Sequence, residues 1–231
     1  MLIRAKFTKE EPVRFISHLD VVRVFDRAVR RASLPIAFSG GFNPRPQMGF
    51  TFPLPVGVTS SSEYVDIKLT EYISPEVFKK KLNDNLPKGF YILEAREVED
   101  DIMPLMSVIN TAVYDVVIKT GVKYDERTLH FIFDNFLNMD NIIIKKEKKK
   151  RGKKYSKNVN IRPFIYSLKI LSREYDKFIL EMKLHAARVS VGQVIQALKQ
   201  WDDKLNNWEM EKVHRKGLFI KKNSELFSPF D

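Results

Sequence analysis

The amino-acid sequence predicts an α+β fold built from two tandem βαββαβ units. The main observation is that the order strand, helix, strand, strand, helix, strand can be traced twice along the 231 residues. That length is typical of one large domain or two small ones. A hydrophobic content of 44% is enough for a packed core, and a charged content of 30% is close to that of soluble proteins.

The first predicted unit begins with a strand and a long helix. Ile3, Ala5 and Phe7 alternate with polar residues, which is the pattern of a half-buried strand. A helix is predicted from about Ser17 to Ala32, because Asp20 follows Ser17 by three residues in a capping-box-like start.

The rest of the first unit is predicted from alternating apolar residues, which indicate strands, and from residues that start and end helices. Alternating apolar residues predict strands over 65–69 and 91–95. Ser74 followed by Pro75 is a typical helix start, and Pro87 ends that helix.

The second half of the chain repeats the order, with extra material in its middle. Its predicted elements are strand 114–118, helix 129–137, a strand starting at 142–144, a helical turn after Pro163, strands from 168 and over 178–184 joined by a turn at 174–177, helix 191–201, and strands over 208–214 and 217–220.

Two such units in tandem match the ferredoxin-like pattern, with antiparallel sheets and helices on one face of each sheet. The boundary is predicted near residue 102, where an acidic turn and a proline interrupt the strands. Residues 1–102 then form an N-terminal ferredoxin-like unit with a long Gly/Pro-rich loop at 39–62. Residues 103–231 form a C-terminal ferredoxin-like unit with a basic insertion at 145–157.

The formal charge of +11 is concentrated in this insertion, where nine basic residues and one acid lie between Lys145 and Lys157. Such a run attracts phosphate polymers or acidic partners. The alternative is a solvated loop tip that keeps the protein soluble. The candidate RNA-binding residues of the run are Lys145, Lys146, Lys148, Lys149, Lys150, Arg151, Lys153 and Lys154.

One face of the first predicted helix is also basic, within an arc of roughly 100°. Its candidate nucleic-acid contacts are Arg23, Arg27, Arg30 and Arg31. The alternative is a solvated helix face on which Asp20 and Asp26 pair with some of these arginines.

Residues 32–62 contain a single charged residue, Arg45, together with four of the nine glycines and five of the eleven prolines. A short strand is predicted over 34–38, and the remainder is a long loop. Arg45 between two prolines is held on a stiff segment that suits phosphate recognition, with Asn43 beside it. The alternative is a structural loop that covers the open side of a sheet.

His18 is the candidate catalytic residue, because Ser17 and Asp20 place a hydroxyl and a carboxylate near its imidazole. The alternative is a helix cap in which Ser17 and Asp20 act locally and His18 is a first-turn residue. The remaining histidines lack metal-ligand spacing, so neither a metal nor a cofactor is predicted.

The segments 15–20, 41–46 and 53–57 resemble signatures of the radical SAM-linked proteins, a family with a domain of unknown function, and Asn160-Ile-Arg-Pro163 resembles a further one. The resemblance implies a radical SAM protein as partner. Because no Cys-x-x-x-Cys-x-x-Cys loop occurs, the chain resembles the stand-alone members of this family.

These patterns predict an RNA-binding or substrate-presenting companion of a radical SAM enzyme, acting in RNA modification or processing. One alternative is a metal-independent endoribonuclease that uses His18, and another is a protein-binding scaffold without a nucleic-acid role. The chain has no cysteine, which excludes disulfides and fits a cytoplasmic location. The longest uncharged run, 46–62, holds three prolines and cannot be a membrane helix. The oligomeric state is not predicted.

Overall fold

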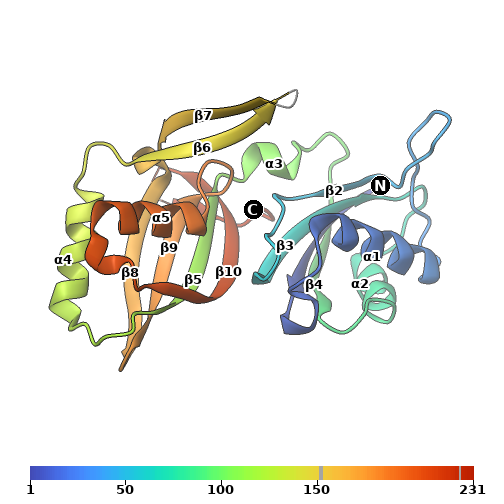
Figure 1. Ribbon diagram of the computed structural model, residues 1–231. Coiled ribbons are helices and arrows are strands. Elements are labelled where there is room, and N and C mark those ends of the chain that lie inside the picture. Colours follow the sequence, from blue (N-terminus) through green and yellow to red (C-terminus); the bar gives the residue numbers. More distant parts are fainter. Residues whose placement is uncertain (151–152, 224) are drawn as a thin grey trace. The chain divides into compact units, whose positions relative to one another are not determined.

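The computed structural model describes residues 1–150, 153–223 and 225–231, with the side chains of 148–155 outside that description. The chain forms two compact units (Figure 1). Unit 1 comprises residues 1–110 and 214–231, and unit 2 comprises residues 111–213. This division differs from the single boundary predicted at residue 102. The difference arises because the long strand β10 (Glu209–Lys222) starts in unit 2 and ends in unit 1.

The elements of unit 1 are β1 (Leu2–Lys9), a 3₁₀ turn (Glu11–Val13), α1 (His18–Arg31), β2 (Met48–Phe50), β3 (Thr59–Lys68), α2 (Pro75–Asn83), β4 (Phe90–Val98), α3 (Leu105–Val108), the end of β10, and β11 (Glu225–Phe227). β1 lies antiparallel between β4 and β3, and β2 pairs antiparallel with β3. β10 pairs parallel with the start of β3, which corrects the prediction of a wholly antiparallel sheet. The direction of β10 is set by the path of the chain, which returns from unit 2 to unit 1 along this strand.

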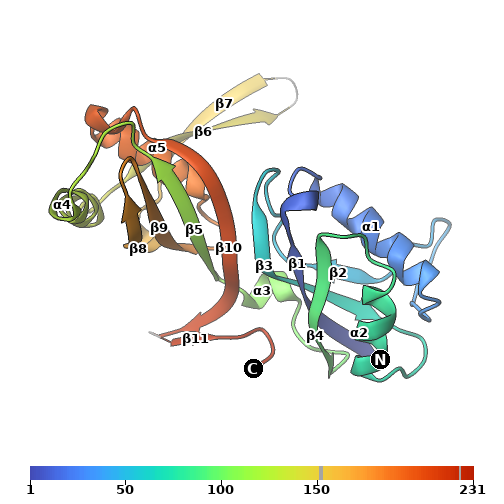
Figure 2. The same ribbon diagram turned by 90° about the horizontal axis from the view of Figure 1, so that it is seen from below.

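Helices α1 and α2 cover one face of this sheet (Figure 2). α1 buries Val21, Phe25, Ala28 and Val29 against the sheet, and the predicted helix is confirmed. The predicted cap is also present, since the Ser17 hydroxyl accepts a hydrogen bond from the Asp20 amide at 3.2 Å.

The elements of unit 2 are β5 (Thr111–Lys119), α4 (Glu126–Leu137), β6 (Ile143–Lys150), β7 (Lys153–Asn160), a 3₁₀ turn (Arg162–Phe164), β8 (Ile165–Glu174), β9 (Lys177–His185), α5 (Val191–Trp201), a 3₁₀ turn (Asp203–Leu205) and the start of β10. The strand order is β10-β5-β9-β8. The predicted turn at 174–177 is confirmed, because Glu174 pairs with Lys177 across β8 and β9.

Two local predictions were wrong, and one strand was missed. Residues 34–38 form only isolated bridges, at Ile36 and Phe38, because Pro35 interrupts a regular ladder. Residues 217–220 continue β10 and are not a separate strand. β7 was not predicted, since its lysine-rich sequence has no apolar alternation. In the described part of the chain, no helix is long and apolar enough to cross a membrane.

Gly89 ends the turn before β4, and a substitution at this position can test the packing of unit 1. Its φ is +103°, and a Cβ added there would lie 2.9 Å from a methyl group of Val13. We expect Gly89→Ala to lower the melting temperature by roughly 2–12 °C, since such strain costs about 1–3 kcal/mol. Gly40→Ala is the control, because nothing lies within 4 Å of a Cβ there. Equal melting temperatures for the two variants would contradict this packing.

Candidate functional site

The basic run lies on an antiparallel hairpin that forms its own two-stranded sheet (Figure 1). β6 and β7 pair from Ile143↔Asn160 to Lys150↔Lys153. Lys145 is exposed, and the Lys146 ammonium donates to the Arg188 carbonyl at 3.1 Å. Of the other candidates, the side chains of Lys148, Lys149, Lys150, Lys153 and Lys154 and the whole of Arg151 lie outside the described part of the structure.

The base of the hairpin is held by the Asn160-Ile-Arg-Pro163 segment. The Asn160 side-chain oxygen accepts hydrogen bonds from the amides of Ile142 and Arg162, both at 3.0 Å. The Arg162 guanidinium donates to the Leu137 carbonyl at 2.6 Å, at the end of α4, and to the Ile165 carbonyl at 3.0 Å. This segment therefore anchors the hairpin to unit 2, a role that was not predicted.

Three of the four candidate arginines of α1 have partners within unit 1. Arg23 pairs with Asp20 at 3.0 Å and Arg30 with Asp26 at 2.9 Å, as the alternative interpretation of this face predicted. Arg31 donates to the Asn85 carbonyl at 2.5 Å. Arg27 is exposed on the same helix.

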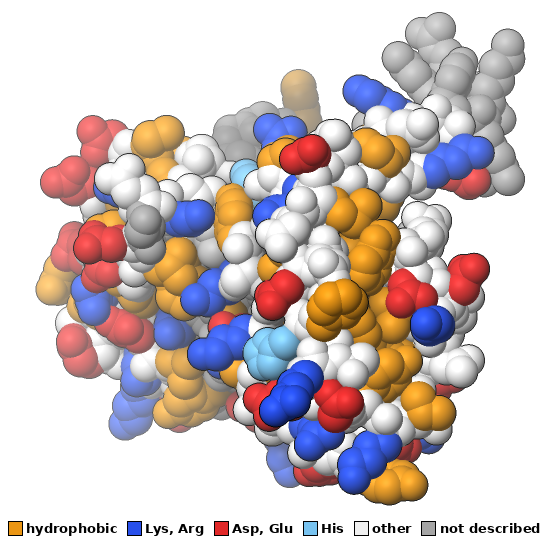
Figure 3. All heavy atoms as spheres, turned by 90° about the vertical axis from the view of Figure 1, so that its left-hand side faces the viewer, with side chains coloured by type: hydrophobic (Ala, Val, Ile, Leu, Met, Phe, Trp, Pro, Cys, Tyr) orange, Lys and Arg blue, Asp and Glu red, His pale blue; other side chains and the backbone are white. Residues whose placement is uncertain are grey.

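Basic side chains are also interspersed elsewhere. On the face of unit 2 in Figure 3, Lys and Arg side chains lie among acidic and hydrophobic ones. The hairpin is therefore a local concentration of positive charge in a chain whose remaining 218 residues carry only about +3 by formal count.

Asn43 and Arg45 are exposed on the loop between α1 and β2. The Arg45 carbonyl accepts from the Ser39 amide at 2.8 Å, and Phe38 at the base of the loop lies under the Arg30 guanidinium at 5.2 Å. Arg30 is twelve residues beyond His18 on the same helix, or about 18 Å along its axis. Arg45 and Asn43 therefore do not form one site with His18, because the loop base lies at the opposite end of α1.

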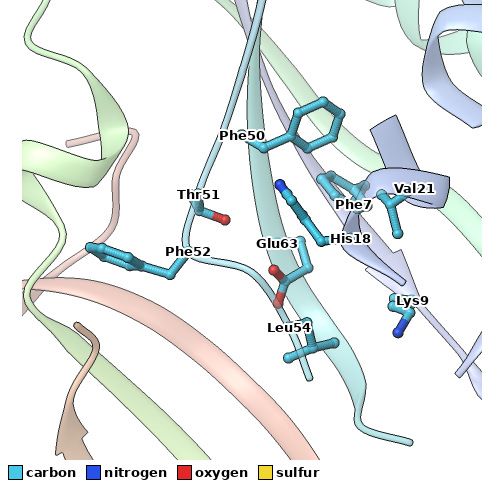
Figure 4. A pocket seen from close by; sticks show the side chains of 9 residues that line it. All are labelled: Phe7, Lys9, His18, Val21, Phe50, Thr51, Phe52, Leu54 and Glu63. Carbon is cyan, nitrogen blue, oxygen red and sulfur yellow. The ribbon is translucent and has the colours of Figure 1, made fainter. Parts of the chain in front are cut away.

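His18 lines a small pocket within unit 1 (Figure 4). The cavity has a volume of about 20 Å³, enough for one or two water molecules. Its lining is mostly apolar, with three polar side chains that reach it from β1, the segment after β2, and β3. The lining residues other than His18 are Phe7, Lys9, Val21, Phe50, Thr51, Phe52, Leu54 and Glu63.

Two buried charges beside His18 were not predicted. The Glu63 carboxylate receives a hydrogen bond from Arg215 Nε at 2.7 Å and a second from Arg215 Nη2, while the same Nη2 donates to the Phe52 carbonyl at 3.1 Å. The Lys9 ammonium donates to the Arg14 carbonyl at 3.0 Å and to the Ile16 carbonyl at 3.3 Å. Lys9 continues the inward-facing positions of β1, which is the sequence signal that could have found it.

Burial lowers the pKa of His18 below its ordinary value. The nearby Glu63 charge opposes this lowering of the pKa, and Arg215 reinforces it. Ser17 and Asp20 hydrogen-bond to each other at 2.7 Å, and the His18 ring instead packs edge-on against Phe50 at 5.9 Å. His18 is therefore biased toward a neutral imidazole that can accept a proton, and the expected grouping of three side chains is a helix cap.

Two of the sequence signatures meet at this pocket. The Gly57 amide donates to the Arg14 carbonyl at 2.8 Å, and Leu54 and His18 both line the cavity. Gly57 has a φ of +85°, a conformation that favours glycine. Segments 15–20 and 53–57 thus form one structure, whereas the loop 41–46 extends away at the far end of α1.

Residues 2–217 match a family described as "Uncharacterized protein conserved in bacteria (DUF2344)", and the chain belongs to this family. That description agrees with the expected domain of unknown function. A comparison with curated proteins finds no match.

Among solved structures, the fold is similar to a chain in the "Crystal Structure of a Cbf5-Nop10-Gar1 Complex", with a TM-score of 0.52 and 10% identity. The similarity covers 98% of this chain and 53% of that one, so this chain spans about half its length. A chain in the archaeal box H/ACA sRNP Nop10-Cbf5 complex has a TM-score of 0.47 at 10% identity, covering 92% and 46% of the two chains. The likeness concerns the mixed α+β fold.

The lowered pKa of His18 predicts a pH dependence of stability. Between this lowered pKa and the ordinary value near 6.5, the unfolded chain binds a proton that the folded chain does not. Stability from this group is therefore present above pH 6.5 and is lost as the pH falls through that window. We expect His18→Gln to lose less melting temperature than the wild type between about pH 7.5 and about pH 5.5. His130→Gln, at an exposed site, is the control, and equal losses in all three proteins would refute the effect.

The ion pair beneath the pocket should dominate the stability of unit 1. Glu63→Gln leaves the Arg215 charge buried without its carboxylate, which typically costs about 3–5 kcal/mol. We expect a fall in melting temperature of roughly 6–20 °C. Asp26→Asn breaks an exposed pair and should change stability by less than about 1 kcal/mol. Thermal unfolding of both variants checks this order, and a small effect of Glu63→Gln would contradict it.

Proposed function

We propose that this protein binds RNA through the β6–β7 hairpin and presents it to a partner enzyme. The observation that carries the proposal is the density of positive charge on two paired strands. Nine basic residues lie within thirteen positions, and the hairpin register places lysine opposite lysine at Lys146↔Lys157, Lys149↔Lys154 and Lys150↔Lys153.

Like charges that face each other across a hairpin destabilise it. A phosphate backbone supplies the missing negative charge and releases its own counterions when it binds. The hairpin therefore gains stability and affinity from the same event, which favours an RNA-binding arm over a solvated loop tip. Arg27 and Arg45, both exposed in unit 1, are proposed as further phosphate contacts.

The partner that we propose is a radical SAM protein, as the sequence resemblance implies. The fold likeness to one chain of a multi-protein complex is compatible with a chain that works in an assembly. We also propose that both units are ferredoxin-like. Two strand orders support this assignment, β4-β1-β3 with β2 beyond β3 in unit 1, and β10-β5-β9-β8 in unit 2.

The hairpin is tested by replacing Lys148, Lys149 and Lys150 with Gln. We expect weaker binding to structured RNA and a shallower salt dependence, with the log–log slope falling by about one for each phosphate that the variant no longer neutralises. Fluorescence anisotropy over a salt series measures both. The charge-matched control replaces Lys80, Lys88 and Lys123, which are exposed and outside the hairpin.

Two results would overturn this function. Wild-type protein that shows no salt-sensitive RNA binding, while it still captures a radical SAM protein, would support the scaffold alternative. RNA cleavage in EDTA by the wild type, lost in His18→Ala, would make the protein an endoribonuclease, for which the neutral imidazole of His18 is the favourable observation. A general acid or base contributes about 10²–10⁴ in rate, so the loss of cleavage in His18→Ala would be easy to measure.

A further inference from the structure

The sheet of unit 1 has a second face, opposite α1 and α2. On β1, Ile3, Ala5 and Phe7 belong to the core under the helices. Because successive side chains of a strand point to opposite faces, Arg4 and Lys6 point to the other side. On β3, Tyr64 and Asp66 share that side, as the hydrogen bonds from Arg4 to Asp66 show.

The C-terminal segment 228–231 covers part of this second face. Arg4 Nη1 donates to the Pro229 carbonyl at 2.7 Å. The Phe230 ring lies 5.5 Å from the Tyr64 ring, at an interplanar angle of 70°. The Arg96 guanidinium lies over Phe230 at 4.8 Å. The Phe230 ring therefore contacts both a tyrosine and an arginine.

The charges around Phe230 include both signs. Arg4 forms a two-bond pair with Asp66, at 2.8 and 2.9 Å, and Arg96 pairs with Glu94 at 2.6 Å. Lys6 adds a further positive charge on this face. The Arg4 guanidinium thus has its Nε and Nη2 engaged by Asp66, while its Nη1 is engaged by the tail.

We propose that this face is a stacking platform for a base of single-stranded RNA, and that Phe230 of the chain's own tail occupies the position of that base. The proposal deepens the proposed function and rests on it. A base between Tyr64 and Arg96 would gain aromatic stacking and a cation–π contact. Departure of the tail would free Arg4 Nη1 for a charge-assisted bond to the adjacent phosphate.

Two observations favour a displaceable tail. Phe230 is only partly buried, whereas Tyr64 beneath it is 2% exposed. The preceding strand β11 is held separately by its pairing with β10, from Ile220↔Phe227 to Lys222↔Glu225. Residues 228–231 can therefore leave the face without breaking a strand pair.

The test measures the affinity of the full chain for a fluorescein-labelled eight-nucleotide adenosine RNA. Phe230→Ala removes the competing ring, and we expect tighter binding by at least about fivefold, the lower limit for one base–aromatic stack. Adding Arg96→Gln to Phe230→Ala should cancel most of the gain. Phe227→Ala is the matched control, since that ring lies 5.7 Å from the Lys222 ammonium and outside the platform. Melting temperatures of all variants show whether each one remains folded.

The outcomes separate this proposal from the proposed function. If the hairpin variant loses RNA binding but Phe230→Ala binds as the wild type does, the platform is refuted and the RNA-binding function stands. If Phe230→Ala gains affinity while the hairpin variant is unchanged, the platform is supported and the hairpin function fails. If Phe230→Ala binds a labelled Ser-Pro-Phe-Asp peptide but gains no affinity for RNA, the face is a peptide site and the platform is overturned.

Discussion

Glu63 and Arg215 form the ion pair on which the arrangement of unit 1 depends. Their side chains are 6% and 1% exposed, so each charge relies on the other in place of water. One lies on β3 and the other on the returning strand β10, far apart in the sequence. Because an unpaired buried charge is strongly unfavourable, the pair holds these strands in one register and keeps the last part of the chain in the first unit. The same pair sets the charges around His18.

The charged residues of this protein occur in two contrasting settings. Inside unit 1, Glu63–Arg215 and Arg4–Asp66 are bidentate and buried, and both satisfy a further backbone carbonyl. On the β6–β7 hairpin, the sequence places nine basic residues beside one acid. Paired buried charges stabilise a fold, whereas a run of basic residues with few acids nearby in the sequence gains most by meeting a polyanion. This contrast is why the hairpin, and not the His18 pocket, carries the proposed function.

Local patterns predicted many of the individual elements. α1 starts at its predicted Ser17 cap, and the turn at 174–177 joins β8 to β9 as the polar turn residues indicated. These features depend on neighbours within a few residues, so they can be recognised in one sequence. β7 could not be recognised in the sequence, because a strand that is paired through its backbone needs no apolar alternation. The distance between Arg45 and His18 also could not be predicted from the sequence, since it depends on the length and direction of α1.

The sequence by itself determined the α+β composition, the concentration of charge at 145–157 and the candidacy of His18, because composition and short spacings are properties of the chain. Tertiary structure alone decided that Lys9 and Glu63 line the His18 pocket, with Arg215 bound to Glu63. It also decided that Phe230 contacts Tyr64 and Arg96. These interactions join residues up to 166 positions apart. Their partners are chosen by strand pairing and by the need to satisfy buried charges, and neither leaves a local pattern in the sequence.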